Sequence, residues 1–131
     1  MNDAVRVAEM IRTLSDDCGQ LRELGARILA AIECCDVETA RGHLLEFQLV
    51  QDSHFRFQNR LMEEAAYPAM EEHVRCHERL YTILMAINGA LCSGRCSALT
   101  AELAAFIEET LAHIHEMDQP FHDFLIGEKS G

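Results

Sequence analysis

The sequence predicts an all-α protein, an antiparallel up-down-up-down four-helix bundle with a short C-terminal tail. Apolar residues recur at alternating intervals of three and four along four long segments, which is the spacing of a helix that buries one face. The segments have similar lengths and short connections, and such helices pack most simply in antiparallel order. No alternating apolar and polar run, the pattern typical of a strand, occurs in the chain.

The first helix is expected over about residues 3 to 34, and the second begins after Asp36, which is a suitable N-cap. The buried stripe of the first helix comprises Ile11, Leu14, Cys18, Leu21, Gly25, Ile28 and Ile32. Gly25 on this stripe permits either a close approach of a second helix, the commoner use, or a small dry pocket for a diatomic gas. The inward face of the second helix comprises Leu44, Phe47, Val50, His54, Phe57, Gln58 and Leu61.

Pro68 suits the first turn of the third helix, which should end near Asn88-Gly89. The inward residues of that helix are His73, His77, Leu80 and Leu84. Ser93-Gly94 marks the next loop, and the fourth helix should end at Pro120, before the tail around residues 121 to 125. The inward residues of the fourth helix are Leu99, Leu103, Phe106, Thr110, His113 and Met117.

Composition indicates one domain that spans residues 1–131, because 131 residues with 49% hydrophobic content suffice for a single core. The net charge of −11 and the lack of a basic run argue against a nucleic-acid partner. No apolar run is long enough for a membrane span, and the N-terminus lacks the apolar core of a signal peptide. We therefore expect a cytoplasmic protein whose six cysteines are thiols rather than a disulfide scaffold.

Histidines on the inward faces of three helices point to a metal site. His73 and His77 are four residues apart and present two imidazoles from one helix face, which is a common beginning of a Zn or Fe site. His54 and His113 lie on the inward faces of the second and fourth helices, and Asp118 follows His113 by five residues. Burying these polar groups costs several kcal/mol unless each finds a partner, and a metal ion satisfies them together.

The segment from His54 through Leu61-Met62 and Tyr67-Pro68 to the paired histidines, followed by His113-x4-Asp118, resembles the single-domain bacterial proteins of the hemerythrin family. The resemblance implies a four-helix bundle around two non-heme iron ions. It assigns His73, His77, His113 and Asp118 to a first metal position and His54 to a second.

The chain departs from the family pattern at two positions. Gln58 stands where the resemblance implies a bridging glutamate, and the next residue is Asn59. No histidine occurs on the first helix, and a spacing common in the family leads from His54 back to Cys18. Cys18 is then either a thiolate ligand of Zn or Fe or a small buried hydrophobic residue. Three outcomes follow: a one-metal site, a di-iron site completed by Cys18 and solvent, or a vestigial site.

The resemblance implies a protein that binds or senses O2 or a related small oxidant such as NO or peroxide, with one or two iron ions or with Zn as cofactor. The alternative is a redox-sensing or metal-sensing interaction module in which Cys18 and the loop thiols act. An enzyme ranks last because no second inward acid is evident to deliver protons.

The remaining histidines and cysteines favour simpler interpretations. His43 and His122 are expected on the surface, His115 points away from His113, and Glu116 faces solvent. Cys76 lies one position off the face of the paired histidines and is expected to pack against a neighbouring helix. The loop cysteines are either scattered or clustered at one end of the bundle, and they comprise Cys34, Cys35, Cys92 and Cys96.

Overall fold

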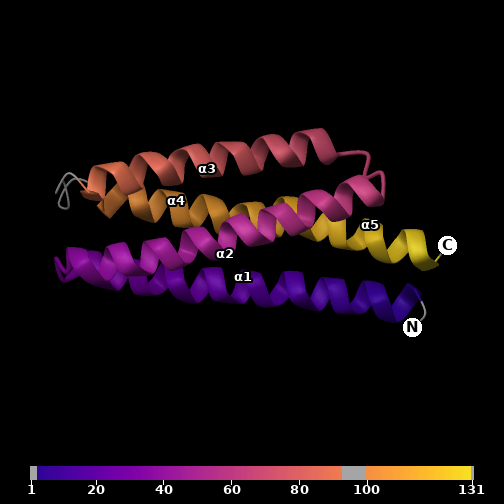
Figure 1. Ribbon diagram of the computed structural model, residues 1–131, viewed down its shortest axis with the longest axis horizontal. Helices are drawn as coiled ribbons and strands as arrows, with labels where there is room; N and C mark the ends of the chain where they lie inside the picture. Colours follow the sequence, from indigo (N-terminus) through magenta and orange to yellow (C-terminus); the bar gives the residue numbers. More distant parts are fainter. Residues whose placement is uncertain (1–2, 93–99, 131) are drawn as a thin grey trace.

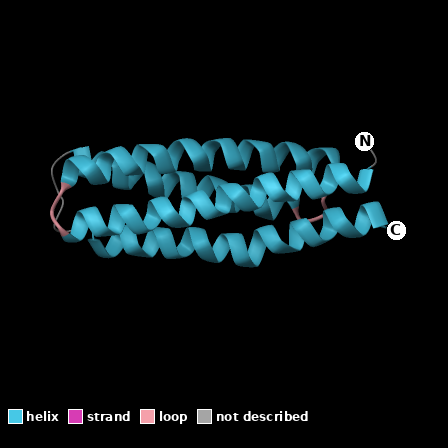
Figure 2. Cartoon of the chain, turned by 90° about the horizontal axis from the view of Figure 1, so that it is seen from below, coloured by secondary structure: helices cyan, strands magenta, loops and turns pink. Residues whose placement is uncertain are grey.

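The four-helix bundle predicted from the sequence is the fold of the protein. A computed structural model describes residues 3–92 and 100–130, and all regular structure in those ranges is helical. The elements are α1 (Asp3–Glu33), α2 (Val37–Glu64), α3 (Met70–Cys92), α4 (Thr100–His113), a π-helix η1 (Ile114–Asp118) and α5 (Gln119–Ser130). Figure 1 shows consecutive helices running in opposite directions, with α4, η1 and α5 following one another as a single rod. Figure 2 shows the same elongated bundle from a perpendicular direction.

The turn between α1 and α2 is fixed by backbone hydrogen bonds and a side-chain cap. Cys35 adopts a left-handed backbone conformation (φ 57°), and the Asp36 amide donates to the carbonyl of Ala31 at 2.8 Å. This pattern, in which a left-handed residue follows the last turn, closes a helix C-terminus. Asp36 then accepts a hydrogen bond from the backbone N–H of Thr39 at 3.2 Å, so the predicted N-cap is confirmed.

The turn between α2 and α3 repeats the same geometry with different residues. Ala66 has a φ of 53°, and the Tyr67 amide donates to the carbonyl of Met62 at 3.0 Å. Pro68 lies in the turn that precedes α3 rather than in its first helical turn, since α3 begins at Met70. Pro68 thus lies in the connection between α2 and α3, where its missing N–H removes no helical hydrogen bond.

The end predicted for the third helix near Asn88-Gly89 is wrong, because α3 continues to Cys92. The buried stripe of α3 extends past the glycine to Leu91, which is 1% exposed. Burial of a leucine side chain contributes about 1.5–3 kcal/mol, which exceeds the cost of about 1 kcal/mol for glycine inside a helix. The next loop, predicted at Ser93-Gly94, and the predicted core position Leu99 lie outside the described residues.

The predicted end of the fourth helix at Pro120 is also wrong, because the short C-terminal tail continues as the helix α5. In a regular α-helix the proline ring clashes with the carbonyl of the fourth residue before it. The five residues before Gln119 form the wider π-helical turn, which relieves that clash. Phe121 and Leu125 are buried and pack in one apolar cluster with α1 and α2, so burial continues beyond the proline.

The apolar core has two parts, with the polar residues of interest between them. The larger cluster includes Leu21 through Ile32 of α1, with partners on α2, α3 and α4. The smaller cluster comprises Val7, Leu14, Leu61, Met62, Phe121 and Leu125. Along α1, Cys18 lies between the two clusters. Along α2, Gln58 lies between Phe55 of the larger cluster and Leu61 of the smaller one, and His54 directly precedes Phe55.

Gly25 serves the close approach of two helices. A Cβ atom at this position would lie 2.9 Å from Cγ2 of Ile107 on α4, so that side chain fills the space beside the glycine. The pocket for a diatomic gas considered for Gly25 is therefore not formed there.

Candidate metal centre

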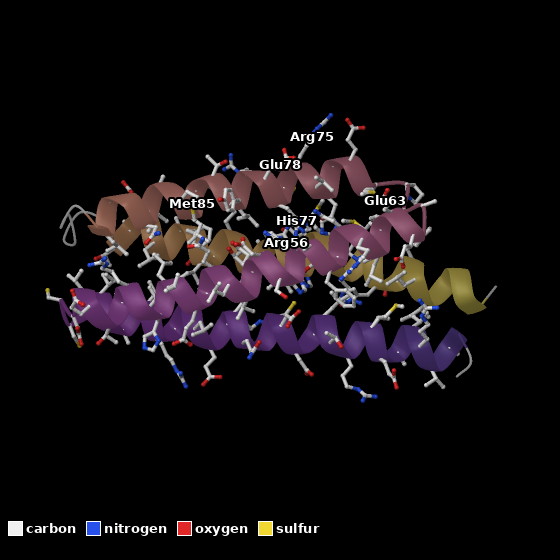
Figure 3. The ribbon with its side chains drawn as sticks, viewed as in Figure 1. Arg56, Glu63, Arg75, His77, Glu78 and Met85 are labelled. Atoms are coloured by element: carbon white, nitrogen blue, oxygen red, sulfur yellow. The ribbon has the colours of Figure 1, made fainter. Side chains whose placement is uncertain are left out.

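Four buried side chains from α3, α4 and η1 meet between the two apolar clusters. His73, His77, His113 and Asp118 each offer one ligand atom, and these atoms all lie within 4.8 Å of one another. None of the four residues is more than 6% exposed. Figure 3 shows His77 pointing into the bundle, whereas Arg75 on the same helix projects into solvent. This buried group of three histidines and one aspartate can hold a metal ion.

The π-helix brings Asp118 onto the same side as His113. The two residues are five positions apart, and in an α-helix such residues point about 140° away from each other. In the π-helical turn Ile114–Asp118 the hydrogen-bonded repeat spans five residues, so His113 and Asp118 face the same direction. The spacing in the sequence signalled this pairing, but its geometric cause was not anticipated.

The contacts within the group are short and centre on Asp118. Its Oδ1 lies 3.0 Å from His73 Nε2 and 3.1 Å from His113 Nε2. The Nε2 atoms of His77 and His113 are 3.1 Å apart. Every histidine of the group therefore presents Nε2 to one common point.

Residues on α2 orient His77 from the other side of its ring. Its Nδ1 lies 2.9 Å from Oδ1 of Asn59, an acceptor that holds the proton on Nδ1 and leaves the Nε2 lone pair facing inward. Phe55 stacks on the ring, with a centroid distance of 3.8 Å and an interplanar angle of 9°. Asn59, which departs from the family pattern, thus acts here as an orienting residue.

Electrostatics favour the protonation states that a metal site requires. Burial, together with the nearby His113 and His73, lowers the pKa of His77 to about 2, so its imidazole is neutral. Burial alone would raise the pKa of Asp118, but hydrogen bonds from His113, His54 and His73 outweigh it and hold that pKa well below the usual range. Asp118 is therefore a carboxylate beside neutral imidazole.

A second group lies on the other side of the same carboxylate. Cys18, His54 and Asp118 offer ligand atoms that also lie within 4.8 Å of one another, and all three residues are buried. His54 Nε2 lies 3.5 Å from Asp118 Oδ2, and its Nδ1 lies 3.1 Å from Oδ2 of Asp17. Burial lowers the pKa of His54, but Asp118 and Cys18 outweigh it and raise this pKa to about 10. Cys18 thus faces the same interior site as His54, as its register on the first helix predicts.

Two buried glutamines of α2 flank His54. Gln58, named from the sequence, and Gln51, which sequence reasoning missed, are both fully buried. None of their amide atoms has a hydrogen-bond partner among the described residues. Gln51 stands three residues before His54 and Gln58 four residues after it, so both lie on the helix face of the histidine. This spacing was the signal in the sequence for Gln51.

His122 is buried rather than exposed as expected from the sequence, with an exposure of 7%. It lies one turn after Asp118 on the side of α5 that packs against α1, and burial lowers its pKa. His43 is half-buried rather than on the open surface. His115 and Glu116 are exposed, as predicted.

The cysteines described outside the site form no disulfide. Cys34 and Cys35 are exposed thiols at the turn between α1 and α2, and Cys76 is a half-buried thiol. The side chain of Cys92 and the whole of Cys96 lie outside the described residues, so the predicted choice between scattered and clustered loop thiols stays open.

Two surface hollows reach the histidines of the first group. One of about 470 Å³ lies between α2 and α3 and is lined by His77, Phe55 and Asn59 among others. Another, of about 200 Å³, lies between α3 and the α4–η1 segment and reaches His113 beside Met117. Both hollows thus border side chains of the first group.

Comparison of the chain with protein-family models, with curated proteins and with solved structures gives no match in any of the three. Within the described ranges, no helix combines the length and the apolar character needed to cross a membrane. The ligand roles of the seven predicted residues accordingly stay predictions. The structure brings six of them into two adjoining groups that share Asp118, and Gln58 belongs to neither group.

Proposed function

We propose that this protein is a non-heme iron protein, similar to hemerythrins, that binds or senses a small oxidant such as O2, NO or peroxide. The principal metal position would be formed by His73, His77, His113 and Asp118. The proposal rests on the donor set and on the spacing of the donor atoms within this group.

The donor set supports an iron position. Three imidazoles and one carboxylate supply nitrogen and oxygen donors, which suit iron. The contacts of Asp118 Oδ1 with His73 and His113, and of His77 Nε2 with His113, measure 3.0, 3.1 and 3.1 Å. The donor atoms are therefore close enough together to bind one ion.

The same distances are compatible with hydrogen bonds, which explains how the group holds together without a metal. The Nε2–H groups of His73 and His113 can donate to Asp118, and the His113 hydrogen is also shared with the Nε2 lone pair of His77 as acceptor. A metal replaces these protons, so the donor atoms need to move little on binding. Such preorganisation raises affinity because little ordering remains to be done.

The chain supplies a protected environment with limited access. Iron bound by four protein donors retains open coordination positions for a diatomic molecule or peroxide. Apolar clusters lie on both sides of the group, and surface hollows border His77 and His113. Asn59 and Phe55 keep the His77 ring in its orientation throughout.

Metal analysis combined with an optical spectrum tests the proposal. Purified protein reconstituted with Fe(II) should bind iron, and its spectrum should change on addition of NO, peroxide or air. His77→Ala and His113→Ala should lose the iron bound at this position, whereas His115→Ala, an exposed histidine two residues from His113, should bind as much iron as the wild type. If iron is bound equally by all three variants, or if zinc is bound and iron is not, the proposal is wrong.

A second candidate function, redox sensing through thiols, is favoured by one observation. Cys34 and Cys35 are adjacent, exposed and unpaired with each other, so oxidants in solution reach them directly. Cys18 lies 16 residues before Cys34 on the same helix, which is about 24 Å at 1.5 Å per residue. The Cys34→Ser and Cys35→Ser variants can be oxidised and their modified residues located by mass spectrometry. This distinguishes thiol sensing at the turn from chemistry at the buried site.

A further inference from the structure

The group of Cys18, His54 and Asp118 differs in chemistry from the four-residue group beside it. It contains a sulfur donor, one imidazole and one carboxylate, contributed by α1, α2 and η1. Cys18 is 4% exposed, and His54 and Asp118 are each 1% exposed. A cysteine that only fills space needs no polar neighbours, but Cys18 lies beside an imidazole and a carboxylate.

Asp17 orients His54 toward this group. Its Oδ2 lies 3.1 Å from His54 Nδ1, so Nδ1 carries a hydrogen and Nε2 faces Asp118 and Cys18. A carboxylate on the outer nitrogen of a histidine is the usual partner of a metal-binding imidazole, because it fixes the ring and raises its basicity. Asp17 and Cys18, which are adjacent on α1, therefore lie on opposite sides of the His54 ring.

Asp118 divides its two oxygens between the two groups. Oδ1 contacts His73 and His113, whereas Oδ2 faces His54 at 3.5 Å. A carboxylate in this position can bind one metal ion through each oxygen. The resulting pair of positions would share one negative charge.

Gln58 adds an independent indication of a ligand. It follows His54 by one turn on the same face, is fully buried, and both amide atoms lack partners among the described residues. A buried polar group without a partner costs about 1–3 kcal/mol, so a bound ion or its water would offset a cost that the fold otherwise bears.

We propose that Cys18, His54 and Asp118 form a thiolate-bearing second metal position, for a divalent ion of borderline softness such as Fe(II), Co(II) or Zn(II). On binding, the Cys18 thiol and Nε2 of His54 each lose a proton to solvent, and the sulfur and that nitrogen form bonds to the metal. This inference rests on the proposed metal centre through the shared Asp118. It makes the two positions unequal: one has only nitrogen and oxygen donors, and the other also has sulfur.

Cobalt titration of the metal-free protein distinguishes the two positions. Co(II) bound by thiolate has an intense sulfur-to-metal charge-transfer band in the near ultraviolet, whereas Co(II) bound only by nitrogen and oxygen has weaker visible bands alone. The wild type should bind two cobalt ions and show both features. Cys18→Ser should bind one ion and lose the charge-transfer band, while Cys76→Ser, a half-buried thiol outside the group, should match the wild type.

His77→Ala separates this inference from the proposed function. The variant should lose the visible bands of the first position and keep the charge-transfer band. X-ray absorption of the cobalt-loaded wild type, which needs no variant to fold, should detect a sulfur neighbour at about 2.3 Å. Absence of sulfur in the wild type, or a charge-transfer band that persists in Cys18→Ser, overturns the second position and leaves the first intact. Sulfur binding with no effect of His77→Ala overturns the first position instead.

Discussion

At the scale of single residues, orientation decides whether the histidines can act together. A metal-binding imidazole must present one nitrogen inward, and the hydrogen bond on its other nitrogen decides which one. Asn59 sets this choice for His77 and Asp17 sets it for His54. Neither residue belongs to the predicted ligand set, and both lie on the outer side of the histidine they contact.

Replacement of Asn59 by leucine should weaken metal binding at the first position about 10–100-fold, the usual effect of removing an orienting partner. The leucine keeps most of the side-chain volume but offers no acceptor to His77 Nδ1. Asn59→Asp retains an acceptor oxygen and should restore most of the affinity, which a role in packing alone would not predict. Competition with a chelator of known affinity measures the change, and equal affinities for leucine and aspartate would contradict an orienting role.

The metal-free protein should lose stability as the pH rises from 6.5 to about 10. His54 has a pKa of about 10 in the folded chain against 6.5 when unfolded, so the folded state binds more protons in this interval. The stabilisation is complete below pH 6.5 and is lost as the pH rises through the folded-state pKa of His54, about 10. Urea midpoints across this range should fall for the wild type, and the fall should be smaller for His54→Gln. If the urea midpoint of the wild type falls no more than that of His54→Gln, the proton on His54 is not the cause.

At the scale of elements, the π-helix η1 has two roles. It turns Asp118 toward His113, and it precedes Pro120 with a turn wide enough for the proline ring. The chain can then continue into α5, whose Phe121 and Leu125 complete the smaller apolar cluster. A single extra residue in the helix thereby serves both the site and the fold.

Deletion of Glu116 should convert η1 into α-helix without changing the direction of the residues after it, because His113 and Asp118 would become four apart. Pro120 would then lie inside a regular α-helix, at a cost of about 3 kcal/mol. We expect the deletion alone to be destabilised by about that amount and the deletion combined with Pro120→Ala to recover. Urea denaturation of the deletion, Pro120→Ala and the combination measures the coupling. Equal loss in the deletion and the combination would show that the proline is not what the π-turn accommodates.

At the scale of the whole molecule, a polar layer interrupts an otherwise apolar bundle. Five polar residues near the boundary between the two clusters are less than 2% exposed: His54, His73, Asp118, Gln51 and Gln58. His77 and His113 belong to the same layer and are 4% and 6% exposed. Packing alone does not require these residues, and apolar side chains of similar size would bury more favourably. We therefore expect the stability of this layer to respond most to a bound ion.

Metal binding should raise the melting temperature substantially. A metal at a thousandfold excess over its dissociation constant stabilises the folded state by about 4 kcal/mol, which corresponds to about 15 °C for a domain of this size. The gain should be much smaller in His113→Ala and unchanged in His115→Ala. Calorimetry with and without Fe(II) under anaerobic conditions measures it. A melting temperature that does not respond to metal in the wild type would remove the role assigned to the polar layer.

The sequence by itself determined the all-α class, the inward faces of the helices and the identity of most of the buried polar residues, with Gln51 and His122 as exceptions. These depend on periodicity, which is local: an apolar stripe and a capping aspartate act within a few residues of each other. The inward direction of Cys18, His54, His73, His77 and His113 followed from the same periodicity. The continuation of α3 to Cys92 did not, because local preference for a stop at Asn88-Gly89 is outweighed by the burial of Leu91 against other helices.

Only the tertiary structure decided which donor atoms lie close enough together to hold one metal ion. The division of Asp118 between two groups, the contact of Cys18 with His54, and the orienting hydrogen bonds of Asp17 and Asn59 join residues from different helices. The depth to which helices interlock and the width of the π-turn fix these distances to within an ångström, and neither is encoded in the spacing of one helix. His122 shows the same limit: its neighbours in sequence suggested the surface, and the packing of α5 on α1 buried it.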